Sequence, residues 1–183
     1  MYCDAPDSPR RRATQTAMHR IFDALCRLLA PIAVFTAEEA WSYLGGSKSV
    51  HLQLFPEQNA EFRNPKAEDQ VGQLLSLRGV IGQAVERARQ EKLIGNALEA
   101  AVVLRCEQAA ISSIPNEELE EFFILSDLKI ESGKEPAALI SKTAHAKCAR
   151  CWRHRSTVGA SAAHPELCDR CESVVTSAAG QQS

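Results

Sequence analysis

The chain has 183 residues, of which 45% are apolar and 24% are charged, and its formal net charge is -2 at pH 7. This length and composition allow more than one small folded unit and exclude a chain that is mostly disordered. The charge excludes binding of nucleic acid through a strong basic field, and the most apolar stretch, LCRLLAPIAVF, is too short to span a membrane.

The first predicted element is a long helix. Ser8 provides a capping hydroxyl, and Pro9 fits the first helical position. Pro31 cannot continue a helix, so we expect this one to end near Ala30. Its apolar residues recur at helical spacing and include Ile21, Phe22, Leu25, Leu28 and Leu29.

A shorter helix and a connector follow. Thr36 and Glu39 have the spacing of a capping box, which predicts a helix from there to Gly45. Residues 50–54 alternate in polarity and predict an extended connector or a strand fragment.

The next segment changes from helical to mixed patterning. Asn64 opens the longest periodic segment, a helix that we expect to end near Lys92. Beyond it we expect a small α/β unit, made of strands at 100–104, 128–130 and 138–141 and a helix at 117–125 that Asn116 caps.

The C-terminal segment contains two CxxC pairs. Cys148 and Cys151 form the first pair, and after sixteen residues Cys168 and Cys171 form the second. Each pair can present two sulfur ligands to one Zn²⁺ ion, at a separation typical of zinc ribbons and knuckles. Few large apolar residues accompany them, so metal binding would supply the folding free energy.

We therefore expect one structural zinc ion per chain, held by the four cysteines. Four thiolates leave no open position for a catalytic metal. Two disulfides or a redox pair would not explain two CxxC pairs at this separation. The isolated Cys3, Cys26 and Cys106 are expected to be ordinary core or surface residues.

Basic and aromatic residues accompany the cysteines, and we select Arg150, Trp152 and Arg153 as candidate RNA contacts. An exposed indole flanked by guanidinium groups is a stacking platform for an unpaired base. The alternative is that Trp152 covers the zinc site or packs on the α/β unit, and the sequence leaves both interpretations open.

The long helix adds Arg87 and Lys92 as candidate RNA contacts. Glu86 and Glu91 lie beside them in the sequence. The simpler interpretation of these charges is a solvated polar face.

Four stretches of the chain resemble the C-terminal part of bacterial isoleucyl-tRNA synthetases. Residues 7–41 are similar to the anticodon-binding helical domain shared by the isoleucine, valine, leucine and methionine enzymes. The segment that follows this domain in the family is similar to SVHLQLFPE. The junction into the family's C-terminal α/β domain resembles ARQEKLIGNALEAAVVL, and the terminal zinc module resembles KCARCW together with LCDRC. Their order matches the family order, and together they cover nearly the whole chain.

The resemblance implies a partner, a role and a location. The intact family enzyme is an ATP-dependent isoleucine–tRNA ligase, and this chain resembles its RNA-recognition end. No HIGH or KMSKS motif and no editing domain is found, so the chain alone is expected to be catalytically inactive. The implied partner is the anticodon stem-loop of isoleucine tRNA, bound by a cytoplasmic monomer.

Two alternatives of other classes remain. DNA-repair glycosylases end in a four-cysteine finger of similar spacing, but they use an N-terminal proline as nucleophile, and residue 2 here is Tyr2. The other alternative is a stand-alone interaction module for nucleic acid or protein in which zinc only stabilises the structure.

The expected fold class is mainly α, with a small α/β unit and a C-terminal four-cysteine zinc ribbon or knuckle. The expected domains are an anticodon-binding helical domain at 1–97, an α/β junction domain at 98–145 and a zinc-binding module at 146–183.

Overall fold

The computed structural model describes residues 2–45, 48–107 and 111–180. The chain divides into two units, Met1–Arg63 and Asn64–Ser183. The domain boundaries expected from the sequence stay a prediction.

The first unit is built on two helices, α1 (Pro9–Leu29) and α2 (Val34–Ser42). The predicted start of α1 is confirmed, because the Ser8 hydroxyl accepts a hydrogen bond from the Arg11 amide and Pro9 occupies the first turn. The helix ends at Leu29, and a tight turn follows in which the Ala33 amide donates to the Leu29 carbonyl at 2.7 Å.

The predicted capping box of α2 is wrong, because the helix begins two residues before Thr36 without a side-chain cap. Glu38 of this segment has another role. Its carboxylate accepts hydrogen bonds from the Ser49 hydroxyl at 2.8 Å and the Val50 amide at 2.9 Å. Residues Val50–Leu52 consequently form a 3₁₀ turn, not the predicted extended segment.

A small core holds the first unit together. Cys26 and Ala30 of the α1 end pack with Ala37 and Val50, and Trp41 lies against them. The Trp41 indole N–H donates to the Lys48 carbonyl at 2.9 Å, which ties the segment after α2 back to that helix.

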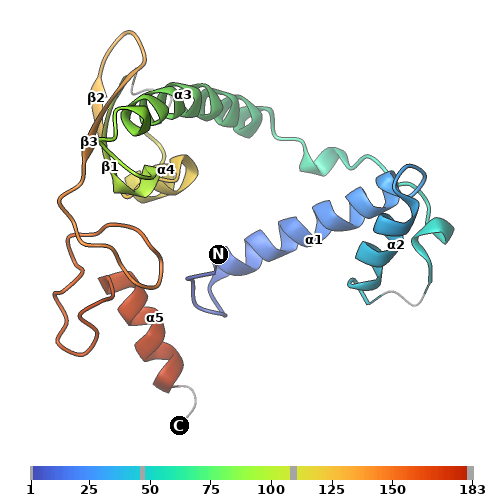
Figure 1. The fold of residues 1–183 in the computed structure, drawn as a ribbon. Coiled ribbons are helices and arrows are strands. Elements are labelled where there is room, and N and C mark those ends of the chain that lie inside the picture. The colour runs from blue at the N-terminus through green and yellow to red at the C-terminus, as the bar shows by residue number, and fades with distance from the viewer. Residues whose placement is uncertain (1, 46–47, 108–110, 181–183) are drawn as a thin grey trace. The chain divides into compact units, whose positions relative to one another are not determined.

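The second unit contains a three-stranded sheet of order β2-β1-β3 (Figure 1). β1 (Ala100–Cys106) pairs in parallel with β2 (Asp127–Ser132) and antiparallel with β3 (Ala137–Lys142). α4 (Asn116–Phe123) connects the two parallel strands. The predicted α/β unit is confirmed by these elements.

The longest helix, α3 (Pro65–Gln90), packs on this sheet. The Asn64 side chain caps it by accepting from the Ala67 amide at 3.1 Å. Alternate residues of β1 form one core with the buried faces of α3 and α4; this core includes Leu74, Leu77, Ile81, Val102, Leu104, Leu119 and Phe123. Both helices therefore bury their apolar faces on the same side of the sheet.

α4 differs from its prediction at both ends. Pro115 is the cap residue, and Asn116 lies in the first turn. The side-chain amide of Asn116 donates to the Leu128 carbonyl at 3.1 Å. The helix stops at Ile124, which is left-handed with φ of 59°.

The C-terminal segment ends in α5 (Asp169–Gly180), which the sequence reading did not predict. Its helical pattern is weak because small and polar residues dominate after Val175. Among the described residues, no helix combines the length and the apolar character needed to cross a membrane.

Candidate metal centre and RNA-facing surface

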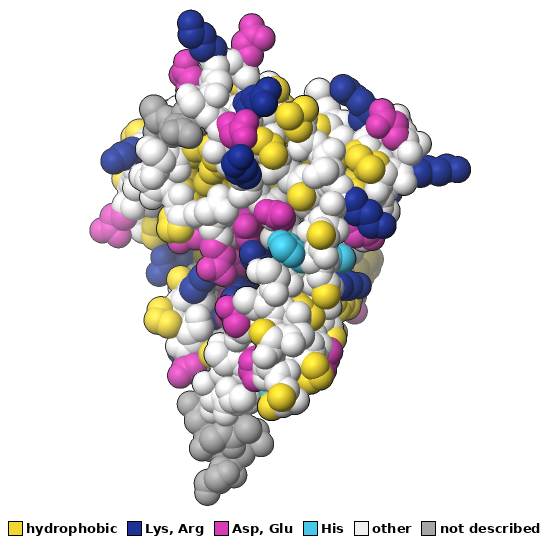
Figure 2. All heavy atoms as spheres, turned by 90° about the vertical axis from the view of Figure 1, so that its left-hand side faces the viewer, with side chains coloured by type: hydrophobic (Ala, Val, Ile, Leu, Met, Phe, Trp, Pro, Cys, Tyr) yellow, Lys and Arg dark blue, Asp and Glu magenta, His cyan; other side chains and the backbone are white. Residues whose placement is uncertain are grey.

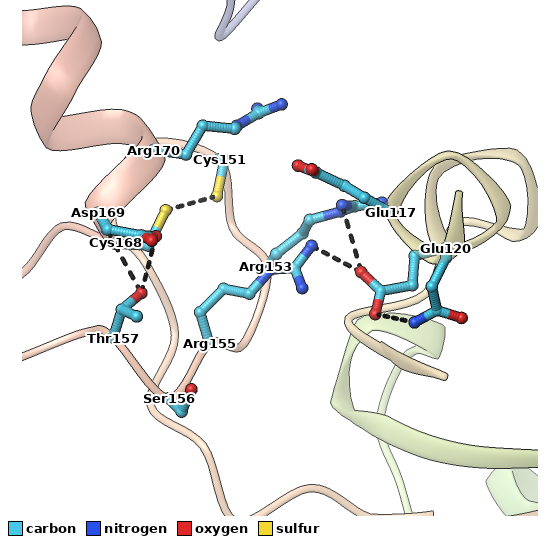
Figure 3. A pocket seen from close by; sticks show the side chains of 11 residues that line it. Glu117, Glu120, Cys151, Arg153, Arg155, Ser156, Thr157, Cys168, Asp169 and Arg170 are labelled. Atoms are coloured by element: carbon cyan, nitrogen blue, oxygen red, sulfur yellow. Dashed lines mark hydrogen bonds and ion pairs between the residues drawn. The ribbon is translucent and has the colours of Figure 1, made fainter. Parts of the chain in front are cut away.

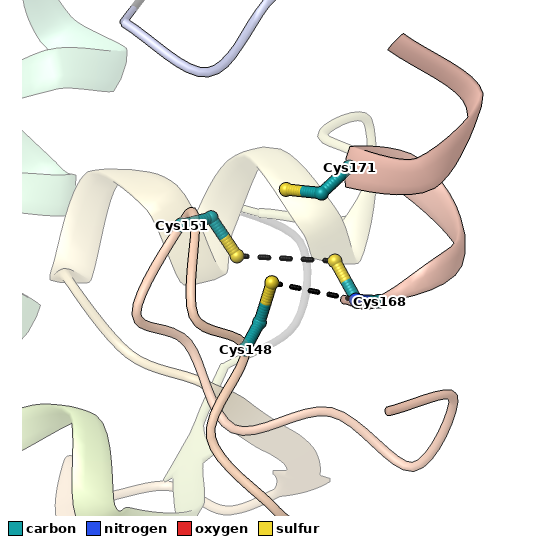
Figure 4. Close-up of side chains that lie close together, drawn as sticks. All are labelled: Cys148, Cys151, Cys168 and Cys171. Atoms are coloured by element: carbon teal, nitrogen blue, oxygen red, sulfur yellow. Dashed lines mark hydrogen bonds between the residues drawn. The ribbon is translucent and has the colours of Figure 1, made fainter. Parts of the chain in front are cut away.

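The first pair of cysteines lies on a tight backbone knuckle. The Cys148 amide donates to the Arg153 carbonyl at 2.9 Å, and the Trp152 amide donates to the Cys148 carbonyl at 3.0 Å. A β-bridge between Lys147 and His154 closes the base of the turn. These bonds hold Cys148 and Cys151 on the same side of the knuckle, as Figure 4 shows.

The second pair lies at the start of α5. Cys168 directly precedes the helix, and Cys171 lies in its first turn. The Ala149 amide donates to the Glu166 carbonyl at 3.0 Å and joins the two halves of the module. The positive end of the helix dipole faces the sulfurs and favours their ionised form.

The four side chains converge on one point. Their Sγ atoms all lie within 4.8 Å of one another, and Cys151 Sγ is 3.8 Å from Cys168 Sγ. A zinc–sulfur distance of about 2.3 Å in a tetrahedron places the sulfurs about 3.8 Å apart. The seven cysteines are all free thiols. The cluster thus fits one structural zinc ion, and the two-disulfide alternative does not fit.

The electrostatics of the cluster also fit a cation. Burial opposes ionisation of Cys148, but backbone N–H donors of Cys151, Cys168 and Arg150 outweigh it and lower its pKa to about 6. Burial raises the pKa of Cys151 and of Cys168. Four packed thiols cannot all ionise without a neutralising charge, and a dication supplies it.

Trp152 stands out from the module surface. It is 62% exposed, so the alternative in which it is buried over the zinc site does not describe this structure. Its backbone is left-handed, with φ of 65°, which bulky residues rarely adopt. The Lys147 ammonium lies 5.5 Å from the indole centroid. The Trp152 indole therefore makes a cation–π contact with Lys147 and remains mostly exposed to solvent.

Arg150 and Arg153 have partners within the protein. The Arg150 guanidinium donates to Cys171 Sγ at 3.8 Å. Arg153 is only 9% exposed and lies 3.9 Å from the carboxylate of Glu120 on α4. Arg150 therefore contacts the metal cluster, and Arg153 is buried against α4.

Arg87 and Lys92 lie at the end of α3 and are both exposed. Lys92 lines a hollow of about 450 Å³ together with Arg89 and, from the end of β3, Lys142. Arg89 is paired with Glu86 at 3.0 Å. The structure brings Lys92 and Lys142 together, a pairing that no short motif in the sequence could indicate.

Charge on the visible face of the molecule is mixed. Figure 2 shows basic and acidic side chains interspersed with apolar ones. This mixture of charges agrees with the small net charge of the chain.

Glu120 is a polar residue of this region that the sequence reading missed. It is 6% exposed, and burial raises its pKa while the guanidiniums of Arg155 and Arg153 offset part of that effect. Its position beside Leu119 on the inner face of α4 is the signal that could have found it. The many acidic neighbours of Glu120 obscured that signal.

Comparisons with known protein families agree with both halves of this description. Residues 1–104 match the family described as the anticodon-binding domain of tRNA ligase. Residues 147–174 match the zinc finger found in FPG and IleRS, and this range contains all four clustered cysteines.

The chain is also similar to several curated proteins. It is 37% identical over 191 residues to isoleucine–tRNA ligase of Syntrophotalea carbinolica, and this alignment covers 96% of the present chain and 21% of that protein. It is 35% identical over 189 residues to the enzyme of Geobacter sulfurreducens, and this alignment covers 95% of the present chain and 20% of that protein. For Gluconobacter oxydans the identity is 38% over 187 residues, with 96% and 19% covered. The chain spans about a fifth of the length of these relatives.

Proposed function

Because the chain belongs to the family of anticodon-binding domains of tRNA ligases, we propose that it recognises the anticodon stem-loop of isoleucine tRNA. The observation that carries this proposal is the succession of the two family matches, with the four-cysteine cluster inside the second. The glycosylase alternative explains the zinc finger alone and leaves residues 1–104 without an account.

The proposed action is binding, not chemistry. In this account the relatives' ligase activity, ATP-dependent attachment of isoleucine to tRNA, belongs to the whole enzyme in the cytoplasm. The present chain, acting as a monomer, supplies RNA recognition and is inactive in aminoacylation by itself.

Trp152 is the centre of the proposed RNA-facing surface. Its indole is exposed, and the hydrogen-bonded knuckle fixes its backbone. An unpaired anticodon base that stacks on it would gain roughly 1–3 kcal/mol. Zinc, when bound, holds the two cysteine pairs together and so keeps this knuckle in shape.

Cations at the end of α3 and in the knuckle would position the RNA backbone. Lys92 is exposed and Arg87 lies on the same end of α3, so both can reach phosphates. Arg150 belongs to the knuckle that carries Trp152, and Arg153 is buried against Glu120, so we propose that Arg150 contributes directly and Arg153 through the fixed shape of the knuckle.

The test is an electrophoretic mobility shift at fixed salt with isoleucine tRNA and with transcripts that differ only in the anticodon. We expect preference for the cognate anticodon. Trp152→Ala should weaken binding while the bound zinc stays at one per chain, and Trp152→Phe should retain much of the affinity. Equal binding of all transcripts would refute anticodon recognition, and binding of no RNA would favour a zinc-stabilised protein interaction module.

A further inference from the structure

The two residues that follow Cys151 differ sharply in burial. Trp152 is 62% exposed, whereas Arg153 is 9% exposed. The Cys148 amide donates to the Arg153 carbonyl, so Arg153 is part of the same hydrogen-bonded knuckle as the cysteine pair. The exposed indole and the buried guanidinium therefore lie on neighbouring residues of one knuckle.

The buried guanidinium lies against α4. Glu120 Oε2 is 2.7 Å from Arg155 Nη2 and 3.9 Å from Arg153 Nη1. The side-chain amide of Asn116 donates to Glu120 Oε1 at 3.3 Å and orients the carboxylate. Figure 3 shows both arginines extending from the zinc module to Glu120. The three side chains line part of a cavity of about 450 Å³.

Glu120 lies against two cations at once. It is 6% exposed, so its ion pairs are screened less than surface pairs. Removing the negative charge would take from Arg153 and Arg155 the buried carboxylate that both contact, and breaking one partner of a buried ion pair is strongly unfavourable.

Further contacts between described residues also join this part of the chain to the module. The His154 amide donates to the Ser126 hydroxyl at 2.9 Å, just after α4. Arg170 lies 3.9 Å from Glu121, and both side chains are about one third exposed. The ion pair between Glu120 and Arg155, at 2.7 Å, is shorter than the contact at 3.9 Å, and its carboxylate is more buried.

We infer that Glu120 is a positioning residue, which locks the zinc module to the α/β unit and thereby holds Trp152 in place for RNA. The last step rests on the proposed function, whereas the locking of the module does not. Glu120 itself is too deeply buried to contact a base.

The experiment compares Glu120→Gln with Glu118→Gln in the full chain loaded with zinc. Both substitutions remove one negative charge from α4, but Glu118 is exposed. Three quantities are measured: bound zinc, the rotational correlation times of residues 147–174 and of β1–β3 from ¹⁵N relaxation, and the affinity for the anticodon stem-loop.

For Glu120→Gln we expect one zinc per chain, faster tumbling of the module than of the sheet, and stem-loop affinity lower by about tenfold. Glu118→Gln should behave as the parent. If the module of Glu120→Gln still tumbles with the sheet, or if Glu118→Gln has the same effect, the inference is wrong.

A second variant keeps the test decisive if Glu120→Gln fails to fold. Arg155→Gln removes the shorter ion pair from the module side and leaves α4 intact, and it should also free the module. If the parent does not bind the stem-loop, the proposed function fails, and the relaxation data alone then decide whether Glu120 locks the module.

Discussion

Trp152 occupies a backbone conformation that costs free energy. Its φ of 65° lies in the left-handed region, where a residue with a Cβ atom is disfavoured by about 1–2 kcal/mol. Strain of this kind persists where the surrounding structure enforces it, and it is concentrated at functional sites. Here the enforcing structure is the zinc knuckle, and the result is an indole held out from the surface.

We therefore expect the module to be more stable in the Trp152→Gly variant than in the Trp152→Ala variant, although both lack the large side chain. Compared with Trp152→Ala, Trp152→Gly should raise the free energy of local unfolding by on the order of 1 kcal/mol, because only glycine adopts this φ without strain. Hydrogen exchange of α5 amides in the zinc-bound protein measures this quantity. A glycine variant no more stable than the alanine variant would show that the conformation is not strained.

Lys92 is the residue to test for phosphate contact. Lys92→Gln should weaken binding of isoleucine tRNA and of anticodon variants alike, and it should reduce the slope of log K against log salt by about 1. Binding titrations at several salt concentrations measure both effects. Lys134→Gln, which removes an exposed lysine from the turn between β2 and β3, is the matched control, and an identical slope for both variants would remove Lys92 from the RNA surface.

At the scale of elements, the zinc module lacks an apolar core of its own. Apart from the cysteines, Leu167 is its only buried apolar residue among those described. Metal binding, on the order of 10 kcal/mol for such sites, would thus supply most of its folding free energy. The sheet and α3 share a separate core that involves no cysteine ligand.

Chelation of zinc should consequently unfold α5 and leave the sheet folded. Amide protection of α5 should be lost while that of β1 remains, as measured by hydrogen exchange. Four additional thiols should become reactive toward a thiol reagent, whereas Cys26 and Cys106, which are buried, should stay protected until global unfolding. Loss of protection in β1 together with α5 would show that the two cores are not independent.

The local signals explain which elements could be predicted. Ser8 and Asn64 each precede a proline and cap a helix with their side chains, so the starts of α1 and α3 follow from short-range chemistry. The start of α2 does not, because its cap residue is Ala33, whose side chain cannot accept a hydrogen bond. α5 was missed because its sequence lacks apolar periodicity.

At the scale of the whole molecule, the metal ligands and the RNA-facing surface differ in how far sequence reveals them. Two CxxC pairs carry their geometry in their spacing, and the sulfur cluster is confirmed. The burial of Arg153, by contrast, depends on Glu120, which lies 33 positions earlier in the sequence. Only the fold brings these charges together, just as it brings Lys142 to Lys92.

The central claim is that a metal-fixed module gives the chain a shape that RNA recognises. The most direct measurement is the affinity for the isoleucine anticodon stem-loop in one sample, as purified, after zinc chelation and after zinc is returned. The account predicts that affinity falls by at least about tenfold on chelation and recovers with zinc. Unchanged affinity in the metal-free protein would contradict it.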